Sequence, residues 1–176
     1  FIARFAGVLA LYALLRWVWP ERRYPAFLVT LLFAVYPGFL QQPNAATFQN
    51  HFIGYSLALI SIALTIAALR SRGWPRLLAV AGSLVCTAGY LWIYEYMLGL
   101  EVMRLALAAA FLHERGITGW KTNARRLLLT YLPNLAVVLA FLGWRFFIFS
   151  SDRPATNVEL IAGKYLAAPI QSLAAL

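Results

Sequence analysis

Charged residues are scarce in this chain, and their scarcity excludes most soluble proteins. Only 12% of the 176 residues are Asp, Glu, Lys or Arg, whereas 62% are hydrophobic and the mean hydropathy is +0.73. A soluble domain carries about 25% charged and about 45–50% apolar residues, so this chain lacks the polar surface that water requires. We therefore expect lipid as its solvent and exclude ordinary soluble enzymes, disulfide scaffolds and disordered tails.

Cysteines and acidic residues are also few. Cys86 is the single cysteine, so the chain has neither an internal disulfide nor a cysteine metal cluster. The sequence contains no HExxH, CxxC, paired-histidine, Walker or dinucleotide-binding pattern, and it supports no metal site and no cofactor. Six acidic residues against 15 Lys and Arg give a net charge of +9. The basic residues lie in short groups between apolar runs, which is typical of membrane-protein loops, so we do not expect nucleic acid as a partner.

The positions of the charges divide the chain into apolar segments. Residues 24–69 contain no charged residue, and this stretch is too long for one span of about 20 residues, so it must fold back at its polar segment, residues 41–51. We predict an all-α fold, a polytopic transmembrane helix bundle in residues 1–149. An outward-facing tail or the start of a further element follows in residues 150–176. The predicted spans lie near residues 1–19, 26–40, 52–69, 77–93, 97–112 and 127–149.

Three basic turns indicate the orientation of the bundle. With six crossings, nine basic residues lie on one side: Arg22, Arg23, Arg70, Arg72, Arg76, Arg115, Lys121, Arg125 and Arg126. Basic loops are retained in the cytoplasm, so we expect an integral plasma-membrane protein with these loops inside. The segment 97–112 is short, about 24 Å as a helix, and a re-entrant helix is the alternative to a span.

Both ends of the chain lie in apolar sequence. Phe1 is already inside the first apolar run, which has neither the basic start nor the small-residue cleavage site of a signal peptide. We expect an internal fragment of a longer membrane protein.

Charged side chains inside the spans are the first functional candidates, because each costs about 2.5–3.5 kcal/mol at mid-span on insertion scales. Glu101 and Arg104 are three residues apart and can pair on one helix face. This pair can simply make a short helix tolerable, or Arg104 can bind an anion such as a lipid phosphate while Glu101 orients it. Arg4 and Arg145 lie towards the outward ends of the first and last spans, where they can snorkel to headgroups or join Arg104 in a basic site.

The outward turns supply the remaining candidates. Glu95, between two tyrosines, can act as a general base or be a solvated helix end. His51 can transfer protons or bind a sugar hydroxyl, although no carboxylate lies near it in the sequence. The uncharged, amide-rich loop before it suits neutral hydroxylated ligands, or it is only a connector that satisfies its backbone outside the lipid. Its candidate binding residues are Gln41, Gln42 and Asn44.

One pattern resembles a known family. An arginine opens a span in Arg4-Phe5-Ala6-Gly7, and a basic turn follows. The outward polar loop is then preceded by Leu31-Leu32-Phe33-Ala34-Val35-Tyr36-Pro37-Gly38-Phe39. Over residues 1–70 this order resembles the middle spans of the GT-C superfamily, multispan glycosyltransferases that use lipid-phosphate sugars and include protein mannosyltransferases and aminoarabinose transferases.

The resemblance implies a bacterial inner-membrane enzyme that takes a sugar from a polyprenyl-phosphate donor on the outward face. Such enzymes usually carry an essential acidic residue in their first outward loop, which by this alignment lies upstream of Phe1. Many also have an acidic residue in the next outward loop, but residues 41–51 contain none. Acidic chemistry from Glu95 is the alternative, though no motif of the family places it there.

Three functions therefore stay open. The first is part of a GT-C-like glycosyltransferase, in which Arg104 or Arg145 stabilises the departing lipid phosphate and the amide-rich loop holds the sugar. The second is a transporter or flippase for an anionic or glycosylated lipid, which uses the same arginines. The third is a non-catalytic membrane subunit whose polar turns bind a partner protein. Membrane lipid is an expected partner.

Overall fold

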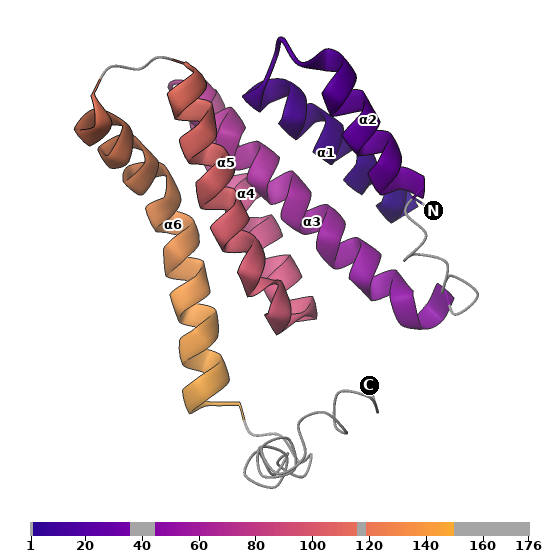
Figure 1. Cartoon of the computed structure of the whole chain (residues 1–176). Helices are drawn as coiled ribbons and strands as arrows, with labels where there is room; N and C mark the ends of the chain where they lie inside the picture. The colour runs from indigo at the N-terminus through magenta and orange to yellow at the C-terminus, as the bar shows by residue number, and fades with distance from the viewer. Residues whose placement is uncertain (1, 36–44, 116–118, 150–176) are drawn as a thin grey trace, which may run out of the picture.

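The structure is a bundle of α-helices (Figure 1). This computed structural model describes residues 2–35, 45–115 and 119–149, and no strand occurs among them. In chain order, the elements are α1 (Ile2–Val18), α2 (Arg23–Val35), α3 (Ala45–Arg70), α4 (Trp74–Ile93), the 3₁₀ helix η3 (Glu95–Gly99), α5 (Leu100–Glu114) and α6 (Trp120–Phe147). The predicted all-α class is confirmed. The proposed tail at 150–176 lies outside the described residues.

Four of the described helical segments are long and apolar enough to cross a membrane, which fits a membrane-embedded protein. They are Gln49–Arg70, Trp74–Ile93, Glu95–Glu114 and Lys121–Phe147. The third of these combines η3 and α5. The short segment predicted at 97–112 is therefore part of a helical segment of 20 residues. A helix of that length reaches about 30 Å, the thickness of the hydrocarbon core. Helix α2 is shorter, with 13 residues.

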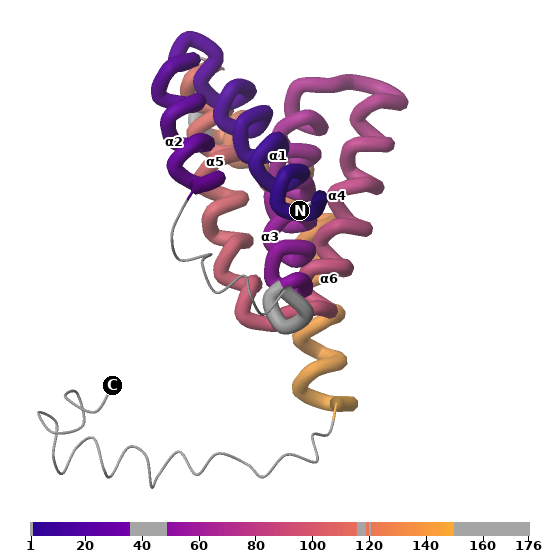
Figure 2. The backbone as a smooth tube through the Cα atoms, turned by 90° about the vertical axis from the view of Figure 1, so that its right-hand side faces the viewer, coloured from indigo at the N-terminus to yellow at the C-terminus, as the bar shows by residue number. Residues whose placement is uncertain are grey.

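Helix α3 occupies the middle of the bundle. It contacts α1, α4, α5 and α6, whereas α2 lies on the outside against α1 (Figures 1 and 2). A sharp turn sends the chain from α3 back along α4. Gly73 adopts a φ of 64° there, a conformation that side chains with a Cβ rarely adopt, and Pro75 lies in the first turn of α4, where a missing N–H costs no helical hydrogen bond.

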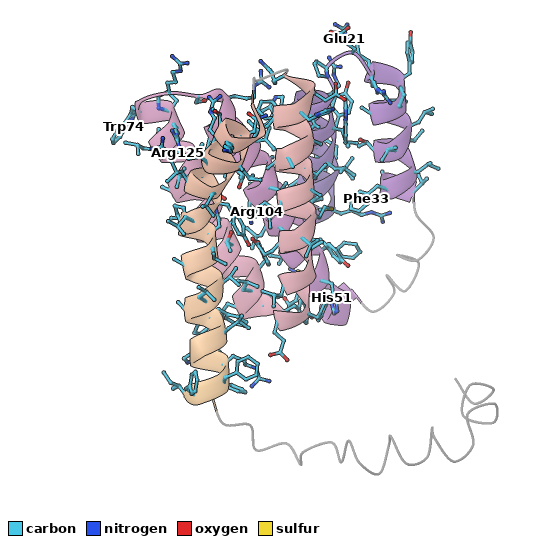
Figure 3. All side chains as sticks on the ribbon, turned by 60° about the vertical axis from the view of Figure 1, so that its left-hand side comes forward. Glu21, Phe33, His51, Trp74, Arg104 and Arg125 are labelled. Carbon is cyan, nitrogen blue, oxygen red and sulfur yellow. The ribbon has the colours of Figure 1, made fainter. Side chains whose placement is uncertain are left out.

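The three basic turns lie at one end of the bundle. Figure 3 shows Glu21, Trp74 and Arg125 at this end, which we call the basic end, and His51 towards the opposite end. The antiparallel course of successive helices produces this grouping, because the α1–α2, α3–α4 and α5–α6 connections all follow an odd-numbered helix. The orientation of the bundle in a membrane remains a prediction.

Two apolar clusters form the core. One joins α1, α3 and α5 through residues such as Leu14, Ile62 and Phe111, and the other includes Tyr90 of α4 and Met97 of η3. Arg104 lies between Met97 and Phe111 along the chain, and Figure 3 shows it between the two ends of the bundle. The fold therefore places a charged side chain deep among apolar helices, where its surroundings decide what it can do.

Candidate functional site

Arg104 is completely buried, with no exposed surface. Its Nη1 atom lies 2.7 Å from Thr65 Oγ1, 2.9 Å from Ser83 Oγ and 3.1 Å from Asn134 Oδ1. These acceptors belong to α3, α4 and α6, so one nitrogen of α5 connects to three other helices.

The second terminal nitrogen completes the surroundings of the guanidinium. Nη2 donates to Ser61 Oγ and Thr87 Oγ1, each at 2.9 Å, and forms an ion pair with Glu101 Oε1 at 3.0 Å. The pairing that the i, i+3 spacing predicts is thus present. The hydroxyl of Tyr90 also donates to Glu101 Oε1. Arg104 and these partners form what we call the Arg104 cluster.

The acceptors of the Arg104 cluster follow a simple helical pattern. Ser61 and Thr65 are one turn apart on α3, and Ser83 and Thr87 are one turn apart on α4, so each pair presents two hydroxyls on the same face. They also bond one another, with Ser61 Oγ 2.9 Å from Thr87 Oγ1. Our sequence analysis missed these residues and Asn134. Hydroxyl pairs at this spacing in apolar helices are the signal that would have found them.

Burial limits the chemistry that the Arg104 cluster can perform. Its cation contacts only side chains and backbone of the bundle itself, so an external anion finds no exposed guanidinium surface. Two atoms of the pair, Glu101 Oε2 and Arg104 Nε, make no hydrogen bond among the described residues. The arrangement joins four helices by hydrogen bonds, which is the structural alternative that the sequence left open.

Glu95 and Arg145 form a separate ion pair. Arg145 Nη2 donates to Glu95 Oε1 at 3.4 Å, and its Nε donates to Oε2. The side chains are 56% and 33% exposed, and the guanidinium also lies over the ring of Phe149 at 4.4 Å from its centroid. Both oxygens of the Glu95 carboxylate therefore accept from one cation, whereas a general base needs an oxygen turned to its substrate.

His51 belongs to an aromatic group that joins α3 to the start of η3. Its Nδ1 lies 2.9 Å from the hydroxyl of Tyr94, and the two rings are 4.2 Å apart between centroids. Tyr96 follows at 6.1 Å from His51 and 5.1 Å from Tyr94. The fold therefore brings His51 to the two tyrosines that flank Glu95 in the sequence.

Arg4 lies near the end of α1 that points away from the basic turns. At 1.5 Å per residue, it is about 20 Å along this helix from Val18. The guanidinium donates to the carbonyl oxygen of Ala34. This carbonyl lies in the last turn of α2, where carbonyl oxygens receive no hydrogen bond from an N–H of their own helix. Its Cζ lies 5.9 Å from the centre of the Phe52 ring.

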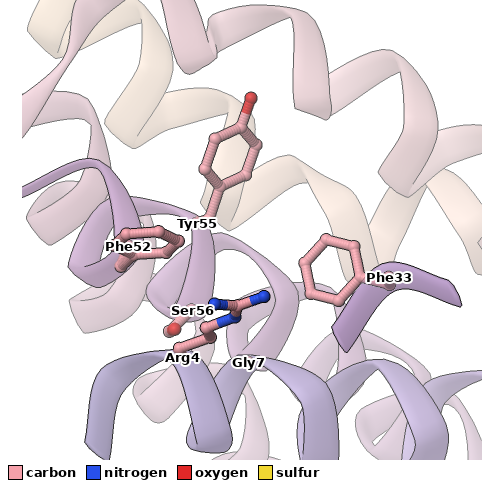
Figure 4. Close-up of a pocket in the computed structure, with 6 residues that line it drawn as sticks. All are labelled: Arg4, Gly7, Phe33, Phe52, Tyr55 and Ser56. Atoms are coloured by element: carbon pink, nitrogen blue, oxygen red, sulfur yellow. The ribbon is translucent and has the colours of Figure 1, made fainter. Parts of the chain in front are cut away.

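Two hollows meet at Arg4. Figure 4 shows the first, a small pocket with aromatic walls and a volume of about 10 Å³, which is lined by Arg4, Gly7, Phe33, Phe52, Tyr55 and Ser56. The second is an open apolar groove of about 620 Å³, lined by Ile2, Arg4, Phe5, Val8 and Ala34. The pocket has room for about one water molecule, so a larger ligand of Arg4 would lie in the groove, which suits an anion whose remainder is hydrocarbon.

Gly7 is the residue that lets α1 approach α3 at the pocket. A Cβ at this position would lie 2.8 Å from the Oγ of Ser56, and Ser56 donates this hydroxyl to the backbone carbonyl of Ala3. The glycine and the serine therefore fix the spacing of the two helices that carry Arg4 and Phe52.

The predicted site residues thus separate into groups. Arg104 pairs with Glu101 inside the bundle, and Arg145 pairs with Glu95 near the surface. His51 lies in the first turns of α3, and Arg4 of α1 contacts the same turns through Phe52. The remaining predicted residues, Gln41, Gln42 and Asn44, lie outside the described residues. In the part of the chain that the structure describes, no group of three or more His, Cys, Asp or Glu could hold a metal ion.

Comparison with known proteins gives no family for this chain. No family model, no curated protein and no solved structure matches it.

Proposed function

We propose that this chain is a membrane-embedded part of a GT-C-like glycosyltransferase and that Arg4 binds the phosphate of its polyprenyl-phosphate-sugar donor. One observation carries the proposal: Arg4 lines an open apolar groove of about 620 Å³, far along α1 from the basic end. In this proposal the basic turns face the cytoplasm of a bacterium and the donor binds from the outward side.

The chemistry of the side chain suits a lipid phosphate. A guanidinium carries five N–H donors in a planar fork, a geometry that matches the oxygens of a phosphate. Hydrogen bonds between a guanidinium and a phosphate are charge-assisted and about twice as strong as neutral ones. The anionic group of the donor would therefore be held at Arg4.

The apolar groove suits the remainder of the same molecule. Ile2, Phe5 and Val8 present only hydrocarbon to it, so an isoprenoid chain can pack there without leaving a polar group unpaired. A ligand with a phosphate at one end of a long hydrocarbon chain would place the phosphate at Arg4 and the chain in the groove.

The other two arginines fit this role less well than Arg4. Arg104 is enclosed by its own cluster, and the carboxylate of Glu95 already engages Arg145. We therefore assign the anion to Arg4 and leave the acidic catalytic residue to the loop that the family resemblance places upstream of Phe1. This chain would then contribute donor binding.

A binding experiment tests the role of Arg4. The chain is placed in phosphatidylcholine nanodiscs and titrated with undecaprenyl phosphate and with undecaprenol, and bound lipid is measured by native mass spectrometry. We expect about tenfold tighter binding of the phosphate, since a hydrogen bond to a charged group contributes about 1.5–3 kcal/mol and 1.4 kcal/mol is a factor of ten. Arg4→Ala should remove this preference.

Arg16→Ala is the matched control. Arg16 lies on the same helix, and its guanidinium also donates to a backbone carbonyl, that of Pro20, but at the basic end. This variant should keep the preference for the phosphate. Equal affinities of the wild type and Arg4→Ala for undecaprenyl phosphate would overturn the proposal.

A second assay separates transfer from transport. The full-length protein that contains this chain is given a hexose-carrying undecaprenyl phosphate in vesicles. Release of sugar-free undecaprenyl phosphate, lost in Arg4→Ala, supports the transferase. Movement of the intact glycolipid across the bilayer, without loss of its sugar, would replace the transferase by a flippase.

A further inference from the structure

The first turns of α3 present two neighbouring faces. Phe52 and Ser56 face α1, because Phe52 lies beside Arg4 and Ser56 donates to Ala3. His51 faces η3, because its ring lies against that of Tyr94. Tyr55 is four residues after His51, so these two share a helix face.

Tyr55 connects the two faces. Its side chain lines the pocket that contains Arg4, while its hydroxyl points away from the guanidinium (Figure 4). Tyr96 lies beside the same part of α3, because its ring centroid is 6.1 Å from that of His51. Tyr55 therefore lies between the Arg4 pocket and the helix face that carries His51.

This aromatic group is held in place by its own contacts. His51 bonds the hydroxyl of Tyr94, and the Tyr94 and Tyr96 rings are 5.1 Å apart. Gly54 allows η3 to pack closely on α3, since a Cβ there would lie 2.8 Å from Met97 Cε. Tyr55 and Tyr96 nevertheless stay 37% and 55% exposed, so the bundle does not enclose their side chains.

We propose that Tyr55 and Tyr96 form a head-group subsite that binds hydroxyl groups of the sugar carried by the lipid phosphate. This inference rests on the proposed function of Arg4. A tyrosine hydroxyl both donates and accepts a hydrogen bond, as a sugar hydroxyl does. Glu95, the charged residue next to Tyr96 in the sequence, is paired with Arg145, so the two tyrosine hydroxyls are the polar groups offered to a neutral sugar.

The positions of His51 and of the Arg4 pocket along the bundle fit a ligand whose phosphate lies deeper in the membrane than its sugar. Figure 3 shows His51 nearer than Phe33, a wall of the Arg4 pocket, to the end opposite the basic turns. A donor with its phosphate at Arg4 would thus extend its sugar past Tyr55 towards the outward surface.

Two ligands and matched variants test the subsite. Undecaprenyl phosphate with and without one hexose is titrated against the chain in phosphatidylcholine nanodiscs. Tyr55→Phe and Tyr96→Phe keep the rings and remove the hydroxyls, so each should weaken binding of the hexose-carrying lipid about two- to tenfold, the range for one neutral hydrogen bond. Binding of the bare lipid phosphate should not change.

The control is Tyr24→Phe, which removes an exposed tyrosine hydroxyl near the basic end. It should affect neither ligand. Arg4→Ala should weaken both ligands, and no effect on either would overturn the proposed function and this inference with it. If Arg4→Ala weakens both ligands but neither tyrosine variant distinguishes them, only the subsite is overturned, and the tyrosines are then interfacial anchors.

Discussion

Arg104 and Arg4 are both arginines in apolar helices, but the bundle surrounds them in different ways. Arg104 meets hydroxyls from α3 and α4, an amide oxygen from α6 and a carboxylate from its own helix. Arg4 meets the carbonyl of Ala34 and the ring of Phe52, and it lines two hollows. One arginine is enclosed by the protein, and the other borders space that a ligand can enter.

The difference shows what a buried charge requires. A cation taken out of water is costly unless its donors find acceptors, so a fully enclosed arginine needs a set of partners that the fold provides in full. Such a set binds the helices together and excludes a ligand. An arginine beside an open groove instead borders space that an anion can enter. The position of an arginine in a membrane bundle, more than its presence, separates a structural role from a binding role.

The largest expected effect comes from breaking the Arg104 cluster. Arg104→Met has a similar length but no charge, and it leaves Glu101 buried without its cation. We expect a loss of about 3–5 kcal/mol in the free energy of unfolding, the cost of removing one partner of a buried pair. SDS titration in mixed micelles measures this loss.

The matched change in the other region is Arg4→Ala. It removes a contact at the end of α2 and should cost less than about 1 kcal/mol. The double variant Glu101→Gln with Arg104→Met should recover part of the loss, because it removes both charges. Equal destabilisation by Arg104→Met and Arg4→Ala would contradict the distinction between the two arginines.

The helices of this fold could be predicted because charges and turn residues interrupt the apolar sequence. The boundary of α6 shows the limit of that reasoning. Hydropathy places a span at 127–149, yet the helix begins at Trp120, because Lys121, Arg125 and Arg126 favour a helix in their own right. A span marks where the lipid begins, and a helix can extend beyond it.

The candidate site could be predicted only within single helices. The Glu101–Arg104 pair follows from a spacing of three residues. The acceptors of Arg104 on other helices depend on how those helices align with α5, which local spacing does not record. The same holds for Arg4, whose pocket needs Phe33 from α2 and Phe52 from α3.

An intermediate loss of stability is expected from a substitution at the Arg4 pocket. Gly7→Ala places a Cβ 2.8 Å from Ser56 Oγ, so α1 and α3 must separate or the Ser56 bond must break. We expect a loss of about 1–3 kcal/mol, typical of overpacking, together with weaker binding of undecaprenyl phosphate. Gly143→Ala is the control, since no atom lies within 4 Å of its added Cβ. Weaker packing in both variants would point to a general glycine effect in place of the close contact.

The smallest effect on stability is expected at the Glu95–Arg145 pair, which contrasts with Glu101–Arg104 by its exposure. Solvent screens an exposed pair, so Glu95→Gln should leave the SDS unfolding midpoint unchanged, as should Glu21→Gln at the basic end. The sugar transfer that we propose should also persist in Glu95→Gln, because both carboxylate oxygens bind Arg145. A loss of transfer of about 100-fold or more, the size of a missing general base, with Glu21→Gln active, would instead place the catalytic carboxylate in this chain, between the two tyrosines beside the proposed sugar subsite.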